Sequence, residues 1–107
     1  MRTRVCSIKD IAEEDVPYGF EIGEMRVVVV KLSGSYYVAN STCTHEEADL
    51  SLGILNGDIL MCPLHQARFD IRTGLVINGP NGGDPKTIPS LKTYKTEVED
   101  GELYIIT

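Results

Sequence analysis

Two short clusters of metal-binding residues in the middle of the 107-residue chain constrain its fold more than any other feature. The first is Cys43-Thr44-His45 and the second is Cys62-Pro63-Leu64-His65, with sixteen residues between them. Together the clusters contain both histidines and two of the three cysteines of the sequence. A fold that joins these side chains in one site must bring two loops together, so the rest of the chain is expected to serve as their scaffold.

Two thiolates and two imidazoles suit either a tetrahedral zinc site or an iron–sulfur cluster in which histidines replace two cysteines at one iron. Paired zinc ligands are usually separated by about two to four residues, whereas a single residue separates Cys43 from His45. A binuclear cluster accepts this short spacing, because the two side chains of one loop can bind different metal atoms. The spacing favours the cluster, with Cys43 and Cys62 on one iron and His45 and His65 on the other, and leaves structural zinc as an alternative.

The rest of the sequence predicts short β-strands joined by turns, since no stretch of ten residues has a clear helical period. We expect an all-β fold, either an antiparallel sandwich or a small barrel. An edge strand over 2–9, a single helical turn over 10–15 and an irregular loop over 78–85 complete the expected elements. The expected strand pairs are 20–24 with 25–32, 54–55 with 59–61, 68–71 with 75–77, and 91–99 with 102–106.

The order of these pairs predicts a single domain, residues 1–107, in which a smaller β unit is inserted into a larger one. The inserted unit is expected over residues 41–80, and the base over residues 1–40 and 81–107. The Asn-Gly turn at residues 56–57 is the strongest short-range signal for a hairpin, and this hairpin would bring both ligand loops to the same end of the smaller unit. Cys6 lies far from both clusters and is predicted to be a small buried side chain, not a ligand.

Charge and hydropathy argue against several classes of protein. The formal net charge is −6 and no basic run is present, which is unfavourable for nucleic-acid binding. The longest apolar run, Val27 to Val30, is far shorter than the roughly 20 residues that cross a membrane. No secretory segment begins the sequence, and an odd number of cysteines suits a disulfide framework poorly. We therefore expect a cytoplasmic protein that does not bind a membrane.

At the four ligand positions the sequence resembles the Rieske family, whose pattern is Cys-x-His, a spacer, and Cys-x-x-His. The resemblance continues through residues 62–74, which look like the second cluster-binding loop and the strand after it. It implies a Rieske-like antiparallel β-sandwich with a small inserted cluster-binding β subdomain. It also implies one [2Fe–2S] cluster, with Cys43 and Cys62 on the inner iron and His45 and His65 on the outer iron, near the surface.

Departures from the family pattern indicate a branch of the family. Respiratory-complex members carry one further cysteine in each loop, joined as a disulfide, where this chain has Ala48 and Leu64. The strand order and length instead resemble a free-standing, oxygenase-associated Rieske ferredoxin. By the same resemblance, Gly79-Pro80 matches a proline-bearing loop that covers the cluster, whereas Gln66 stands where the family often has glycine.

The resemblance also implies a low reduction potential. High-potential members place a serine and a tyrosine to donate hydrogen bonds to cluster sulfurs, where this chain has Ala67 and Phe69. Missing donors destabilise the charge of the added electron, and the acidic residues of the first loop disfavour that charge further. We expect a potential near the low end of the Rieske span, about −150 mV in a range that reaches about +300 mV. The acidic residues are Glu46, Glu47 and Asp49.

The function that the resemblance implies is one-electron transfer by a protein that is not itself an enzyme. A Rieske oxygenase needs a second, mononuclear iron site, typically two histidines and a carboxylate, and both histidines here are already assigned to the cluster. We expect a monomeric carrier that takes electrons from a flavin-containing reductase and passes them to a terminal oxygenase or another reductase. The alternative is a small electron-transfer subunit of a nitrite-reductase-like enzyme, and a zinc-structural module is the third class.

Overall fold

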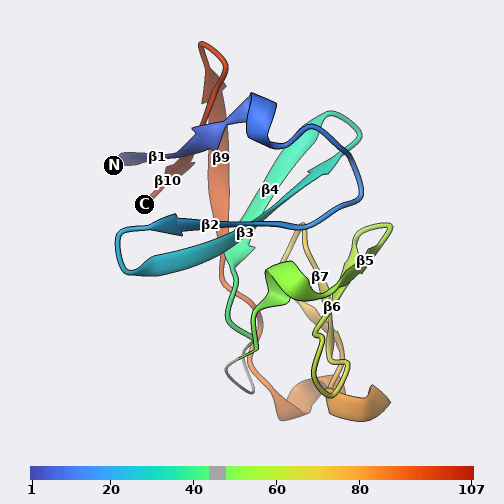
Figure 1. Cartoon of the computed structure of the whole chain (residues 1–107). Helices are drawn as coiled ribbons and strands as arrows, with labels where there is room; N and C mark the ends of the chain where they lie inside the picture. Colours follow the sequence, from blue (N-terminus) through green and yellow to red (C-terminus); the bar gives the residue numbers. More distant parts are fainter. Residues whose placement is uncertain (44–47) are drawn as a thin grey trace.

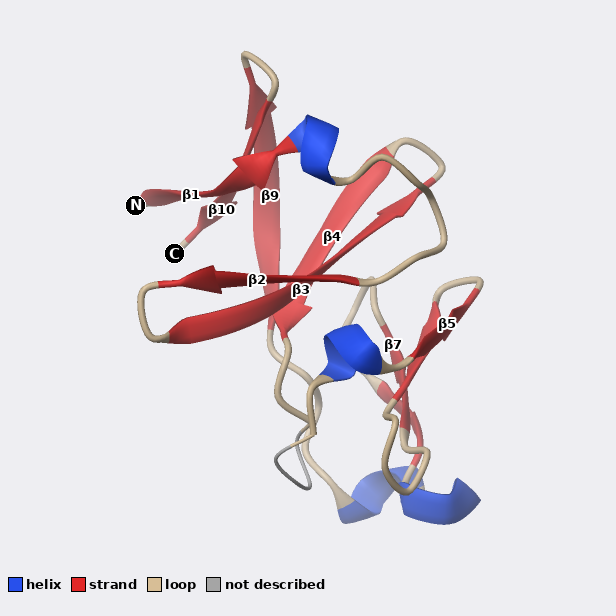
Figure 2. Ribbon diagram, in the orientation of Figure 1, coloured by secondary structure: helices blue, strands red, loops and turns tan. Residues whose placement is uncertain are grey.

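A computed structural model describes residues 1–43 and 48–107. These residues form ten strands in two antiparallel sheets, which confirms the all-β prediction (Figures 1 and 2). The larger sheet has six strands in the order β1-β10-β9-β4-β3-β2, and the smaller sheet has four in the order β5-β6-β7-β8. The six strands are β1 (Arg2–Ser7), β2 (Tyr18–Ile22), β3 (Met25–Leu32), β4 (Ser35–Asn40), β9 (Thr93–Glu99) and β10 (Glu102–Ile106). The four strands are β5 (Ile54–Asn56), β6 (Ile59–Met61), β7 (Arg68–Asp70) and β8 (Val76–Asn78).

Strand β3 is buried on both faces, which explains its run of four valines. Val27 and Val29 belong to one apolar cluster, together with Leu103 and Ile105, whereas Val28 and Val30 belong to a second cluster on the opposite face. Side chains alternate between the faces of a strand, and a strand covered on both faces reads as a continuous apolar run of β-branched residues. β3 therefore separates two apolar cores.

The smaller sheet packs one face onto the second of these cores. Leu60 of β6 and Phe69 of β7 are fully buried in it. The β5–β6 hairpin has the predicted turn, in which Gly57 has a φ of +62°. The connection from β8 back to β9 carries two short 3₁₀ turns, which lie at the end of the molecule away from both termini (Figure 1). These turns are η3 (Pro80–Gly82) and η4 (Pro85–Thr87).

The predicted strand pairs form with small shifts at their ends. β2 begins at Tyr18, and β9 begins at Thr93. The helical turn expected over residues 10–15 was wrong, since the 3₁₀ turn η1 (Ile8–Asp10) ends at the first residue of that segment. The reason is a capping box: the Ser7 hydroxyl accepts a hydrogen bond from the Lys9 N–H, and the Asp10 carboxylate accepts one from the Ser7 N–H. Among the described residues, no helix is long and apolar enough to cross a membrane.

Candidate metal centre

The two segments that carry the predicted ligands are closed by the same kind of backbone hydrogen bond. In the first segment the N–H of Cys43 donates to the carbonyl of Ala48 at 2.9 Å, and in the second the N–H of Cys62 donates to the carbonyl of Ala67 at 2.8 Å. Each bond joins a cysteine to a buried alanine five positions later. The ends of the two loops are therefore closed in the same way, although their cysteine-to-histidine spacings differ.

Both cysteines lie on the buried side of these loops. Cys43 is 3% exposed and Cys62 is fully buried, and both belong to the apolar cluster that contains Val28, Leu60 and Phe69. The structure thus brings the two predicted cysteine ligands, from segments before and after the β5–β6 hairpin, into one core. That core lies between β3 and the smaller sheet.

The two predicted histidine ligands differ in what the structure describes. His65 lies on the exposed part of the second loop with a φ of +50°, and Gln66 follows with a φ of +59°. Two consecutive residues in this region turn the chain sharply, and the Gln66 N–H donates to the carbonyl of Leu64 at 2.5 Å. Glycine adopts positive φ without steric cost, so Gln66 occupies a glycine-favouring conformation. His45 falls within residues 44–47, outside the described residues.

The proline-bearing segment is joined to the second ligand loop. The N–H of Asn81, within η3, donates to the carbonyl of His65 at 2.5 Å. The segment closes on itself through the N–H of Gly79, which donates to the carbonyl of Gly83 at 3.0 Å. These bonds hold Pro80 beside the loop that carries His65.

The sequence profile of the Rieske [2Fe-2S] domain matches residues 1–95. The chain belongs to the Rieske family. The ferredoxin component of the naphthalene 1,2-dioxygenase/salicylate 5-hydroxylase systems of Ralstonia sp. is 38% identical to it, over 77% of this chain and 78% of that protein.

Solved Rieske structures extend this similarity to the full fold. The Sphingomonas yanoikuyae B1 ferredoxin matches with a TM-score of 0.87 and 29% sequence identity, over 100% of this chain and 99% of that chain. A chain in the complex of reduced oxygenase and oxidized ferredoxin in carbazole 1,9a-dioxygenase matches with a TM-score of 0.81 and 29% identity, over 96% of this chain and 99% of that chain. Both cover the two sheets almost completely.

The cofactor of a Rieske domain is a [2Fe–2S] cluster, and the described residues fit it. Cysteine sulfurs that bind iron are best screened from water. The burial of Cys43 and Cys62 provides this screening. Ala67 and Phe69, also fully buried in the same core, bring no hydroxyl group to it. Among the described residues, no three His, Cys, Asp or Glu side chains form a site for a single ion. A binuclear cluster needs only two protein ligands at each iron, so this finding does not argue against it.

A polar cluster at the base of the first ligand loop was not predicted from the sequence. The Asp49 carboxylate accepts hydrogen bonds from the hydroxyl of Ser41, from the hydroxyl of Ser51 at 2.6 Å and from the N–H of Ser51 at 2.9 Å. It also accepts one from Nε of Arg26 at 2.7 Å. Asp49 caps the 3₁₀ turn η2 (Leu50–Leu52), and an Asp before this segment was a visible capping signal. No local signal connects it to Arg26, which lies 23 positions earlier.

This environment keeps Asp49 ionised. Its partial burial opposes ionisation, but the hydrogen bonds from Ser41, Ser51 and Arg26 outweigh burial and lower the pKa of the carboxyl to about 2. The negative charge that the sequence analysis assigned to Asp49 is present, but the positive charge of Arg26 lies directly beside it. Glu46 and Glu47, the other two acidic residues named there, lie outside the described part of the chain.

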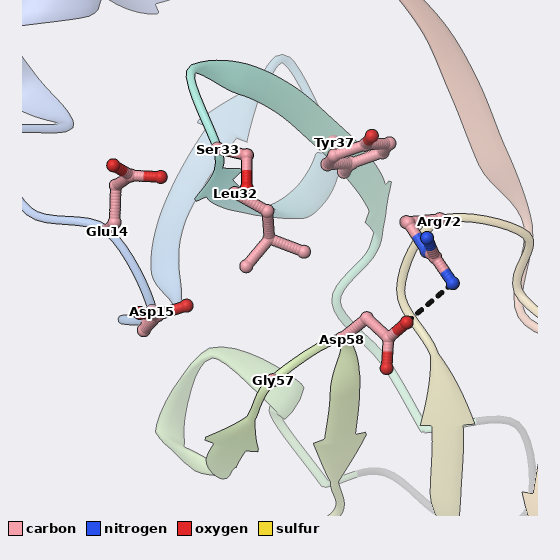
Figure 3. A pocket seen from close by; sticks show the side chains of 8 residues that line it. All are labelled: Glu14, Asp15, Leu32, Ser33, Tyr37, Gly57, Asp58 and Arg72. Carbon is pink, nitrogen blue, oxygen red and sulfur yellow. Dashed lines mark ion pairs between the residues drawn. The ribbon is translucent and has the colours of Figure 1, made fainter.

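An open cleft of about 530 Å³ separates the β3–β4 turn from the β5–β6 turn (Figure 3). Asp58 and Arg72 form an ion pair of 2.5 Å on one side of it, and Glu14 and Asp15 lie on the other side (Figure 3). Within residues 1–43 and 48–107, no residue of either ligand loop lines it. The described candidate ligands Cys43, Cys62 and His65 therefore lie outside this cleft.

Proposed function

We propose that this protein is a one-electron carrier that holds one [2Fe–2S] cluster through Cys43, His45, Cys62 and His65. The observation that carries the proposal is the matching closure of the two loops, in which each cysteine N–H donates to an alanine carbonyl and each cysteine is buried. The assignment of His45 rests on the Cys-x-His pattern of the sequence. When bound, the cluster supplies the chemistry by taking up and releasing one electron.

The chain's own residues would shield one side of the site and leave the other side accessible. The apolar core keeps water from the two cysteine sulfurs, and the loop that carries His65 is exposed. Leu64, next to His65 in the sequence, is 53% exposed, so a docking partner would meet an apolar side chain beside the proposed histidine ligand. A redox partner that docks on this loop would come close to the outer iron. We also propose that residues 41–80 form the cluster-binding subdomain and that residues 1–40 and 81–107 form its base.

The proposed partners follow from the relatives. The Ralstonia protein is named as the ferredoxin component of dioxygenase and hydroxylase systems, and the carbazole structure is named as a complex of a ferredoxin with an oxygenase. We infer that a terminal oxygenase accepts the electron from this protein and that a flavin-containing reductase donates it. The proposed carrier is a monomer without catalytic activity of its own. Its proposed compartment, the cytoplasm, rests on the sequence alone.

Spectroscopy of the purified protein tests the cluster. We expect about two irons and two sulfides per chain, colour in the visible range, and an electron paramagnetic resonance signal that appears on reduction. Two imidazole ligands should add nitrogen hyperfine couplings to that signal. Cys43→Ala and Cys62→Ala should lose the cluster, whereas the control Cys6→Ala should keep it. A colourless protein that contains zinc would refute the proposal.

A reconstituted electron-transfer chain tests the carrier role. The reductase and oxygenase components of a naphthalene dioxygenase system serve as probes, with NADH as the electron source. We expect the oxygenase to form product only when this protein is present and can be reduced and reoxidised repeatedly. We expect no product with Cys62→Ala. Isolation of the protein in a permanent complex with a large catalytic chain would instead support the nitrite-reductase-like alternative.

A further inference from the structure

Arg26 holds the segment that leads from β4 into the first ligand loop at two points. Its backbone carbonyl accepts a hydrogen bond from the N–H of Ser41 at 3.0 Å. Its side chain donates from Nε to the Asp49 carboxylate at 2.7 Å and from a terminal nitrogen to the Ser51 hydroxyl at 3.4 Å. One residue of the six-stranded sheet therefore contacts both the entry and the exit of the loop.

Asp49 lies at the neck of that loop. It pairs with Thr42 in an isolated antiparallel bridge, and directly opposed residues of such a pair have their Cα atoms about 4.5–5.5 Å apart. Thr42 immediately precedes Cys43, and Asp49 immediately follows Ala48, whose carbonyl accepts the Cys43 N–H. Asp49, whose carboxylate is ionised, is thus one of the two residues that flank the hydrogen bond closing the loop.

Strand β2 is shaped to accommodate the Arg26–Asp49 pair. A Cβ atom on Gly19 would overlap with a terminal nitrogen of Arg26 and would approach the Ser51 hydroxyl to 2.6 Å. The absence of a side chain at Gly19 lets the guanidinium group pack against the β2 backbone. The Asp49 side chain is 26% exposed and the Arg26 side chain 39% exposed, so water only partly screens this pair.

We propose that the Arg26–Asp49 pair is a positioning and charge-balancing device, which fixes the neck of the first ligand loop and sets the reduction potential of the cluster. The inference rests on the proposed function, because it requires the cluster to bind beside Cys43. A cluster gains one negative charge on reduction, so an unbalanced negative charge nearby disfavours reduction and an unbalanced positive charge favours it. The intact pair contributes one charge of each sign.

Opposite single substitutions test this balance by the midpoint potential of the holoprotein, measured by spectroelectrochemistry. Arg26→Met leaves the Asp49 carboxylate without its cation, so the potential should fall. Asp49→Asn removes the carboxylate that accepts the Arg26 Nε–H and leaves Arg26, among the described residues, only the exposed Glu21 carboxylate at 3.7 Å, so the potential should rise. The double variant should return close to the parent value. A tenfold change in the reduction equilibrium corresponds to about 59 mV for one electron, and we expect each single shift to be of this order or smaller.

Two further variants separate charge from structure. Arg26→Lys keeps the positive charge and should have a potential closer to the parent than Arg26→Met does. Arg2→Met removes an exposed arginine that is paired with Glu99 on β9, and it should leave the potential unchanged. If Arg26→Met cannot hold the cluster, the midpoint potentials of Arg26→Lys and Asp49→Asn still show whether loss of the Asp49 charge raises the potential.

Three outcomes would overturn the proposal. The first is a shift of both single variants in the same direction, and the second is an unchanged potential in both with an intact cluster spectrum. The third is equal potentials in Arg26→Lys and Arg26→Met. If the parent protein holds no cluster, its own spectrum shows this before any variant is made, and the proposed function fails together with this inference.

Discussion

Cys6 is a buried cysteine that lies in a different core from the two predicted cysteine ligands. It lies on β1, is 3% exposed and belongs to the apolar cluster of the larger sheet, as the sequence predicted for a small buried side chain. Burial raises the pKa of its thiol to about 11. The thiolate is the nucleophile and the metal ligand, and Cys6 keeps a neutral thiol in the core that holds neither Cys43 nor Cys62, so it is suited to packing.

The first prediction concerns this thiol. Iodoacetamide at pH 8 should label Cys6 in the native holoprotein far more slowly than in guanidinium, as measured by mass spectrometry. The folded pKa of about 11 lies above the ordinary value of 9.0, so the stability linked to the neutral thiol is fully present below about pH 9 and is lost as pH rises through about 11. Cys6→Ala should cost about 1 kcal/mol at pH 7, and this cost should shrink by pH 10.5 in urea unfolding. Rapid labelling of Cys6 at pH 8 would contradict the argument.

At the scale of single elements, the β5–β6 hairpin carries the chain from the first ligand loop to the second. Gly53 caps η2 and precedes β5, and a Cβ atom there would overlap with the carbonyl oxygen of Met61. Met61 is the residue before Cys62. Gly57 has a φ of +62°, but a Cβ atom there would meet nothing within 4 Å. The two glycines are thus required for different reasons, the first for close approach of two backbones and the second for turn conformation.

This difference predicts distinct outcomes for two glycine-to-alanine variants. Gly57→Ala should cost about 1–2 kcal/mol, the usual cost of a left-handed conformation for a residue with a side chain, and should keep a full iron content. Gly53→Ala should displace the strand that leads into Cys62, so its iron content should fall. Iron analysis and thermal unfolding of the two variants check this. Equal iron contents would show that Met61 can move without disturbing the second loop.

The sequence predicted the elements that depend on local signals and missed those that depend on distant contacts. The Asn-Gly turn and the valine run of β3 are local signals, and the strand pairs predicted from them, β5–β6 and β2–β3, both form. The first-loop acidic residue Asp49 was predicted to act as a free negative charge, because nothing near it in the sequence points to Arg26. Gln66 occupies a positive-φ position that its residue type disfavours, and the only sequence signal for it was the glycine that the family often has at this position.

At the scale of the whole molecule, β3 divides the protein into two cores with different tasks. One face of β3 contributes to a core whose described members come from the larger sheet and the segment around Ile11. The other face contributes to the core that contains Cys43, Cys62 and the inner face of the smaller sheet. Packing in the first core can stabilise the fold without affecting the cluster. Packing in the second core stabilises the fold and also surrounds the cysteine sulfurs proposed to bind the cluster.

Neighbouring valines on β3 can separate these two tasks. Val28 and Val29 are both fully buried, but Val28 belongs to the core with the two cysteines and Val29 to the other. Each Val→Ala change should destabilise the protein by about 2 kcal/mol, since each leaves a cavity of similar size. Only Val28→Ala alters the surroundings of the cysteine sulfurs, and weaker shielding from water eases the uptake of a negative charge. Its reduction potential should therefore rise.

Val29→Ala is the matched control, because it should unfold at the same urea concentration as Val28→Ala and keep the parent potential. Denaturant unfolding and spectroelectrochemistry of the same two samples give both quantities. If the two variants shifted the potential equally, the cluster would respond to general loosening of the fold. A shift confined to Val28→Ala would instead show that β3 separates the redox site from the core that keeps the larger sheet folded.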